Sequence, residues 1–210
     1  MLFRSQVGEA RLSAVLAGDG SLVGIPVFAR FSEGEYLCWD PTPRADILDA
    51  WMGFVRSIES DGVAPYAATD VEDVSDATVP LLLWGPMAEE VLSDYLAPDD
   101  ALPAVGRIAS VLLDGTISCV LVRPAQLPHA LLLLVPEQHA TILWRSLLSF
   151  NVVCPVGRLA LWRHLVDLWP HAEDLLGHDR VTIGRDDLLG AGLVRPSYDF
   201  IGGRAIQETE

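Results

Sequence analysis

The chain has 210 residues, of which half are apolar and a fifth are charged, so it is long and apolar enough to bury a hydrophobic core. Acidic residues outnumber basic residues by 29 to 14, and the resulting net charge of −15 disfavours binding to nucleic acids. All 14 basic residues are arginine, which excludes a lysine Schiff base and a phosphate-binding P-loop lysine within this chain.

The sequence contains no apolar run of the roughly 18 to 20 residues that a membrane-spanning helix needs. Its opening stretch, MLFRSQV, lacks the apolar core of a secretory signal, so we expect a cytoplasmic protein that does not bind membranes. The mean hydropathy of +0.32 indicates apolar surface that a partner covers.

The three cysteines, Cys38, Cys119 and Cys154, are widely separated and lie in apolar segments that favour strands. An odd number of cysteines in a cytoplasmic protein argues against a disulfide framework, and their spacing is not that of a zinc site. The pattern therefore predicts reduced thiols in the core.

Residues 11–39 come first in chain order, and their short alternating runs predict β-strands with a turn at Asp19-Gly20. The segment DPTP, which begins at Asp40, then supplies a turn and a helix start. Apolar residues at three- and four-residue spacing follow it and predict a helix with one buried face. They are Ile47, Leu48, Trp51, Met52, Val55 and Ile58. The acidic segment ATDVEDVSD connects this helix with the next strand.

From Val79 the sequence predicts a strand, a Gly85-Pro86 junction and a helix over 87–97. Glycine and proline suit a sharp bend and a helical first turn, so we interpret the junction as architecture rather than chemistry. The segment RIASVLLDGTISCVLVRP carries a hairpin signal at its central Asp-Gly pair. The strand HALLLLVP then leads into the helix EQHATILWRSLL.

NVVCPVGRLALWRHLVDLWP predicts a short strand and a helix that Pro170 ends. The last segment, 171–210, is mostly loop, with DFIGGRAI as a candidate docking segment. The order of elements predicts an α+β fold of antiparallel sheets with flanking helices, arranged as two small lobes. The first lobe spans 1–70 and the second spans 71–170.

Two polar clusters near the end of the chain are candidates for ligand binding. His164, Asp167 and His171 could suggest a metal, but Pro170 breaks the helix between them and no fourth ligand is evident, so no metal site is expected. Four arginines suit an anionic ligand tail or an acidic partner, although we favour solvated surface for them. They are Arg180, Arg185, Arg195 and Arg204.

Five segments in this order resemble the glycine cleavage T-protein (aminomethyltransferase) and related tetrahydrofolate-dependent methyltransferases. They are VEDVSDATVPLLLWGPMAEEVL, LLLLVPEQHATILWRSLL, VCPVG, GHD and GAGLVRPSYDFIGGRAI. The resemblance covers about residues 12–206. It implies two T-protein-like lobes, the first of them partial. It also implies that the chain is truncated at both ends and lacks the family's C-terminal β-barrel.

The resemblance also implies where the chemistry would lie. The family's catalytic aspartate falls on Val23 or Gly24, and neither residue can transfer a proton. The catalytic residues of this chain are therefore unknown, and we expect the acid on a partner subunit.

Four residues are the candidates for binding tetrahydrofolate. The family's pterin-binding glutamate stretch is replaced by AQLPHALLL, in which Gln126 and His129 are the polar groups. An asparagine of the family corresponds to about Asp40 or Pro41, and an arginine of its later helix falls on Leu165, two positions from Arg163. Pterin binding needs a bidentate polar partner, and a glutamyl tail needs arginine or lysine.

The resemblance leads to three hypotheses about function. The first is a subunit of a heteromeric tetrahydrofolate-dependent one-carbon (methyl or aminomethyl) transferase, inactive alone and paired with a second T-protein-like subunit. The second is a non-catalytic scaffold or regulatory subunit that resembles the small subunit of sarcosine oxidase. The third, which needs several relocated residues, is an autonomous folate enzyme.

Overall fold

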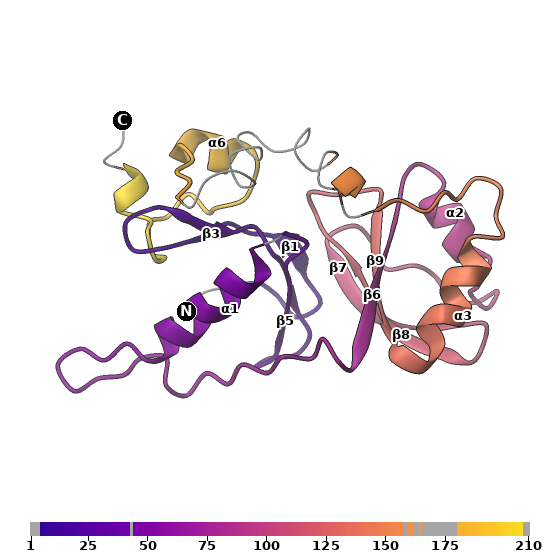
Figure 1. Ribbon diagram of the computed structural model, residues 1–210, viewed down its shortest axis with the longest axis horizontal. Coiled ribbons are helices and arrows are strands. Elements are labelled where there is room, and N and C mark those ends of the chain that lie inside the picture. The colour runs from indigo at the N-terminus through magenta and orange to yellow at the C-terminus, as the bar shows by residue number, and fades with distance from the viewer. Residues whose placement is uncertain (1–4, 43, 158, 162–163, 165–179, 208–210) are drawn as a thin grey trace.

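The computed structural model describes residues 5–42, 44–157, 159–161, 164 and 180–207, and it has an α+β fold with antiparallel sheets (Figure 1). The sheets belong to two lobes that lie side by side, joined by the connector before residue 78. This confirms the predicted α+β class with antiparallel sheets. None of the helices in these ranges has the length and apolarity to cross a membrane.

The first lobe holds a three-stranded sheet and a short hairpin. The sheet order is β1-β4-β5, from β1 (Ala10–Leu12), β4 (Val27–Arg30) and β5 (Tyr36–Trp39). The hairpin pairs β2 (Val15–Leu16) with β3 (Leu22–Gly24), and helix α1 (Ala45–Arg56) follows β5. The hairpin turn is fixed by Asp19, whose Oδ1 accepts hydrogen bonds from the backbone N and the Oγ of Ser21.

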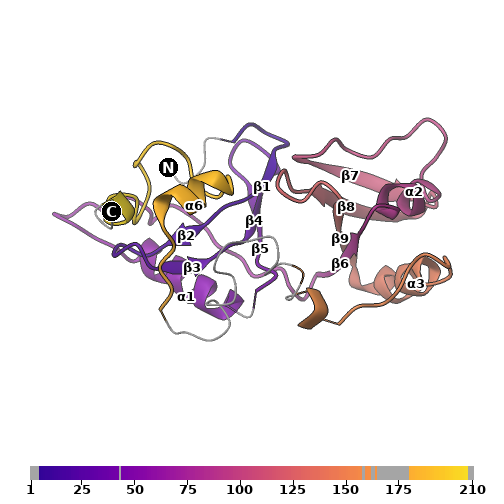
Figure 2. The ribbon, with the colours of Figure 1, turned by 90° about the horizontal axis from the view of Figure 1, so that it is seen from above.

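The second lobe is a four-stranded antiparallel sheet with two helices on one face. Its order is β6-β9-β8-β7, from β6 (Thr78–Trp84), β7 (Arg107–Leu113), β8 (Ile117–Arg123) and β9 (Ala130–Pro136). Helices α2 (Ala88–Ser93) and α3 (Glu137–Leu147) cover the face that lies away from the first lobe (Figures 1 and 2). The predicted Asp114-Gly115 turn closes the β7–β8 hairpin, with φ values of 51° and 64°.

Strand β9 is buried on both faces, which explains its unbroken run of apolar residues. Leu131, Leu133 and Val135 pack with α2 and α3. Leu132 and Leu134 pack in a second core that includes β1 and β4 of the first lobe. The sheet of the second lobe therefore stands between its own helices and the first lobe (Figure 2).

The two lobes are also joined through their backbones. Ala10 donates its N–H to the carbonyl of Gly106 at 2.8 Å, and Ile108 donates to the carbonyl of Gly8 at 2.9 Å. The core shared by the lobes and these hydrogen bonds join the lobes at β1.

Residues 180–207 pack on the first lobe. They form α6 (Arg185–Gly190), the short 3-10 helix η1 (Ala205–Gln207) and the loops around them. Leu22 donates its N–H to the carbonyl of Val181 at 2.7 Å, and Ala14 donates to that of Leu193 at 2.9 Å. Apolar side chains of this segment complete the first-lobe core: Val181, Ile183, Leu188, Leu193 and Ile206.

Two predicted elements differ from the structure. Helix α2 is shorter than predicted and ends at Ser93, because the chain turns there to bury Tyr95. Residues 151–157 form a turn and irregular chain rather than a strand, with Val152 58% exposed. An apolar run without a neighbouring strand has no ladder to join. The helix predicted before Pro170 lies largely outside the described residues.

Candidate functional site

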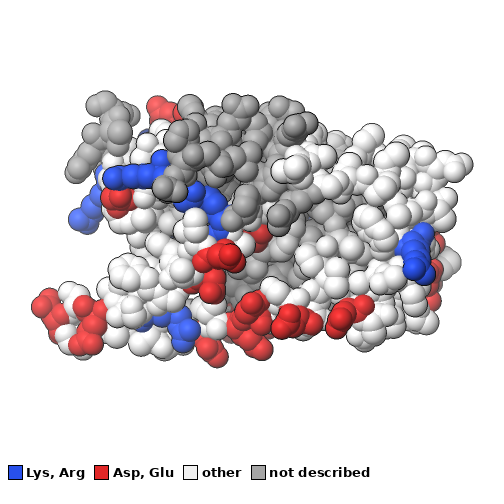
Figure 3. Space-filling view, viewed as in Figure 1, with Lys and Arg blue, Asp and Glu red and all other residues white. Residues whose placement is uncertain are grey.

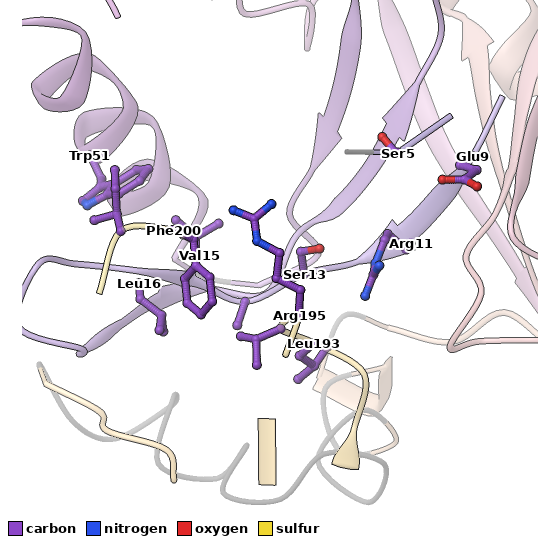
Figure 4. A pocket seen from close by; sticks show the side chains of 13 residues that line it. Ser5, Glu9, Arg11, Ser13, Val15, Leu16, Trp51, Leu193, Arg195 and Phe200 are labelled. Carbon is purple, nitrogen blue, oxygen red and sulfur yellow. The ribbon is translucent and has the colours of Figure 1, made fainter. Parts of the chain in front are cut away.

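A cavity of about 200 Å³ opens in the first lobe between β1, β2, α1 and residues 193–201 (Figure 4). Its walls come from segments that are far apart in the sequence, and the packing of residues 180–207 on the first lobe brings them together. The lining residues are Ser5, Glu9, Arg11, Ser13, Ala14, Val15, Leu16, Trp51, Leu193, Val194, Arg195, Phe200 and Ile201.

Two arginines line the cavity. Arg11, on β1, donates from Nη2 to the carbonyl of Gly192 at 2.7 Å, and its Nε is buried without a hydrogen-bond partner among the described residues. Arg195 forms an ion pair with Asp199, whose Oδ1 lies 2.9 Å from Nε. The Nη2 of Arg195 also donates to the backbone carbonyl of Asp199. A guanidinium carries five N–H donors, so both arginines keep donors for a ligand.

Aromatic and acidic side chains complete the walls. Trp51 faces the cavity from α1, and Phe200 lies near Arg195, whose guanidinium carbon is 5.7 Å from the ring centroid (Figure 4). Glu9 is the one carboxylate in the lining, and its Oε2 accepts a hydrogen bond from the N–H of Gln6 at 2.8 Å. The lining suits an anionic ligand with a planar apolar part.

Asp40 lies behind one wall of this cavity. Its Oδ1 accepts a hydrogen bond from the N–H of Thr42 at 2.8 Å, whereas its Oδ2 is buried with no hydrogen-bond partner in the described part of the chain. Oδ2 lies 2.7 Å from the point where a Cβ on Gly24 would stand. Gly24 pairs across the hairpin with Val15, which lines the cavity. The carboxyl therefore occupies space that any side chain at position 24 would need.

Burial raises the pKa of Asp40, and hydrogen bonds from Thr42 and the positive charge of Arg44 offset only part of that effect. Arg44 is itself buried and donates from Nε to the carbonyl of Val23 at 3.1 Å. Asp40 consequently holds a proton more readily than an ordinary aspartate. This is the property that a general acid requires.

Cys38 and Cys119 have poorly reactive thiols. Burial, with a smaller contribution from Asp40, raises the pKa of Cys38 to about 12, and burial raises that of Cys119 to about 11. Such thiols stay protonated at neutral pH and are poor nucleophiles. All three cysteines are free, as predicted, but Cys154 is exposed rather than in the core, because residues 151–157 run over the surface.

Gln126 is committed to the joint between the lobes. Its Oε1 accepts the N–H of Leu12 at 2.9 Å, and its Nε2 donates to the carbonyls of Leu12 at 3.1 Å and Gly192 at 2.9 Å. The Oε1 and Nε2 of Gln126 are therefore already bonded to the backbone, and these are the groups that would form hydrogen bonds with a pterin. Gln126 thus positions β1 and the Gly192 loop, and through them the cavity wall.

The other candidates are spread over the molecule. His129 is exposed in the loop between β8 and β9, and Arg163 lies outside the described residues. No described contact joins Asp40 with Gln126 or His129. The structure therefore does not gather the described candidate residues into one site. Two other residues, Arg11 and Arg195, line the cavity instead.

Metal binding finds no support in the described part of the chain, where no group of three His, Cys, Asp or Glu side chains could hold an ion. His164 lies edge-on to Trp84, with ring centroids 4.4 Å apart. Asp167 and His171, the other members of the sequence cluster, lie outside the described ranges.

Comparison with known proteins gives no family: no protein-family model matches the chain, and no curated protein matches it. The resemblance of the five segments to the T-protein family therefore supports a proposal about function and does not assign the chain to that family.

Proposed function

We propose that the chain is a subunit of a heteromeric tetrahydrofolate-dependent one-carbon (methyl or aminomethyl) transferase. In this proposal it supplies the anion-binding part of a shared site, and a second T-protein-like subunit supplies the rest. Tetrahydrofolate carries the one-carbon group when bound. The observation that carries the proposal is the cavity that holds Arg11 and Arg195 together.

The arginines and the aromatic side chains of the cavity support the glutamyl end of the cofactor as its ligand. Arginine binds carboxylates through parallel N–H donors, and tetrahydrofolate ends in a glutamate with two carboxylates. Trp51 and Phe200 offer apolar contact to the benzoyl ring beside that glutamate. The residues present thus fit the tail of the cofactor.

The size of the cavity supports a shared site. About 200 Å³ is below the roughly 300 to 1,000 Å³ of pockets that enclose a whole cofactor. Gln126, the candidate pterin partner, has its amide bound to the backbone. The pterin ring and the reacting nitrogen would therefore lie against the partner subunit.

A second function, a non-catalytic scaffold that resembles the small subunit of sarcosine oxidase, is favoured by a different observation. Val23 or Gly24 stands where the resemblance expects the catalytic acid, and Gln126 serves the fold. In that case the chain would support a partner and bind no folate. The two proposals differ in whether the arginine cavity takes a ligand.

Calorimetric titration of the chain with p-aminobenzoyl-glutamate, the tail of folate, tests the proposal. We expect saturable binding with a Kd in the millimolar range, because the lone chain holds only one part of the ligand. Arg11→Gln should weaken binding about tenfold, since it removes one charged donor. Arg195→Gln should do the same.

Arg145→Gln, on the exposed surface of α3, is the matched control and should leave the Kd unchanged. Melting curves check that the Arg195 variant, which loses its ion pair with Asp199, remains folded. Absence of saturable binding by the wild type, or equal binding by all four proteins, would favour the scaffold.

A further inference from the structure

Helix α1 carries apolar side chains on two faces, and only one of these faces is buried in the core. Leu48 and Val55 face the core of the first lobe. Ile47, Trp51 and Phe54, at four- and three-residue spacing, form a second stripe that we call the α1 apolar face. Ile47 is 47% exposed and Phe54 is 63% exposed, while Trp51 is half-buried and also lines the arginine cavity.

The surroundings of the α1 apolar face are strongly acidic. Residues 45–76, which cover the helix and the connector to β6, contain eight acidic residues and a single arginine, Arg56. Arg56 lies 3.9 Å from Asp70, so the connector passes beside the end of the helix. Figure 3 shows acidic side chains gathered along the lower edge of this view, over α1 and the connector.

The apolar centre and acidic rim of this surface indicate the chemistry of a partner that would bind it. Exposed apolar stripes on a helix mark interaction surfaces, and the rim of an interface selects a partner of opposite charge. We propose that the α1 apolar face binds a protein whose contact surface is apolar at its centre and basic at its rim. That the partner is the second subunit of the transferase rests on the proposed function.

A second copy of this chain does not fit the surface. A symmetric dimer through α1 would place the two acidic rims against each other, in a chain whose net charge is already −15. The residue Trp51 links the proposed interface with the arginine cavity, so a partner seated on α1 would also reach the mouth of the proposed folate site.

A synthetic peptide that copies the chemistry of the partner's contact surface tests the α1 apolar face. The probe is a fluorescent amphipathic helix of leucine and lysine of about 14 residues, and its counterpart has glutamate in place of lysine. We expect the lysine peptide to bind with a Kd that rises steeply as NaCl increases. The glutamate peptide should not bind, and light scattering should find the free chain monomeric.

Serine substitutions locate the binding site while leaving the charge unchanged. The double variant Ile47→Ser/Phe54→Ser should raise the Kd of the lysine peptide at least about tenfold. Ile142→Ser removes an apolar side chain of similar exposure, 64%, from α3 in the other lobe, and it should leave the Kd unchanged. Equal loss in both variants, or no loss in either, overturns the proposal.

Co-purification with a T-protein-like subunit from the same genome separates this inference from the proposed function. If that subunit binds and the double variant has no effect, the heteromer stands and the α1 surface is wrong. If the lysine peptide binds as expected but the subunit does not, the surface stands and the proposed function is contradicted.

Discussion

At the scale of single residues, Asp40 is unusual because it is a buried carboxyl group with incomplete hydrogen bonding among the described residues. One of its oxygens is bound to Thr42, and the other is buried against Gly24 without a described partner. An unpaired buried carboxylate lowers stability, and a protonated one costs much less. The fold thus keeps an acid one strand away from the arginine cavity.

We expect Asp40→Asn to stabilise the chain at neutral pH. Because burial raises the pKa of Asp40 above its ordinary value of 3.8, the folded state binds the proton more tightly than the unfolded state. The wild type therefore loses stability as the pH rises from the unfolded pKa through the folded pKa, and asparagine removes that loss. Thermal melts from about pH 4 to about pH 7.5 measure the effect.

The melting-temperature gain of Asp40→Asn should shrink as the pH falls towards 4. Asp46→Asn, on the exposed side of α1, is the matched control and should change the melting temperature little. A lower melting temperature of Asp40→Asn at neutral pH would mean that the carboxylate has a charged partner that holds it ionised.

The candidate site shows how far single residues can be predicted from the sequence. Asp40 was a candidate through the resemblance, but its burial depends on the absence of a side chain at Gly24, which the sequence does not report. Gln126 was a candidate because it is a polar residue in the stretch that replaces the family's pterin-binding glutamate. Its actual partner, Leu12, lies 114 residues away, and no local pattern reports such a contact. Arg11 was missed because one arginine in a strand carries no local signal.

At the scale of elements, short sequence patterns predicted the features that neighbouring residues determine, such as turns. The Asp114-Gly115 pair specifies a hairpin because both residues tolerate positive φ. The short strand predicted at the start of NVVCPVGRLALWRHLVDLWP is wrong, because a strand needs a neighbouring strand and the sequence does not indicate one. The GAGLVRPSYDFIGG segment builds one wall of the cavity, and this depends on its docking to the β2–β3 hairpin.

Gly202 is in close contact with the β2–β3 hairpin. It has a φ of 78°, and an added Cβ would overlap the carbonyl oxygen of Ala17 and stand 2.8 Å from the Cβ of Leu16. We expect Gly202→Ala to lower the free energy of unfolding by about 2 to 3 kcal/mol, measured by urea denaturation, because it combines steric overlap with a strained backbone.

Gly190→Ala provides the comparison within the same segment. Its Cβ would meet no atom within 4 Å, and it lies in α6, where alanine is the better helix former. It should be neutral or slightly stabilising. Equal stability of the two variants would show that residues 193–207 are not held on the hairpin as described.

At the scale of the whole molecule, the two lobes share one core, and both candidate binding surfaces lie on the first lobe. The shared core and the bonds of Gln126 fix β1 between the lobes. The arginine cavity and the α1 apolar face then lie on the same lobe and share Trp51. The positive mean hydropathy predicted a covered surface, but only the fold indicates which surface remains exposed.

The measurement that tests the shared site most directly is calorimetric titration with tetrahydrofolate. It compares the chain alone, a T-protein-like subunit from the same genome alone, and the mixture of the two. We predict that the mixture binds tetrahydrofolate at least about 100-fold more tightly than the lone chain, because each subunit supplies part of the site. A lone chain that binds as tightly as the mixture, or a mixture no tighter than the other subunit alone, would contradict the shared site.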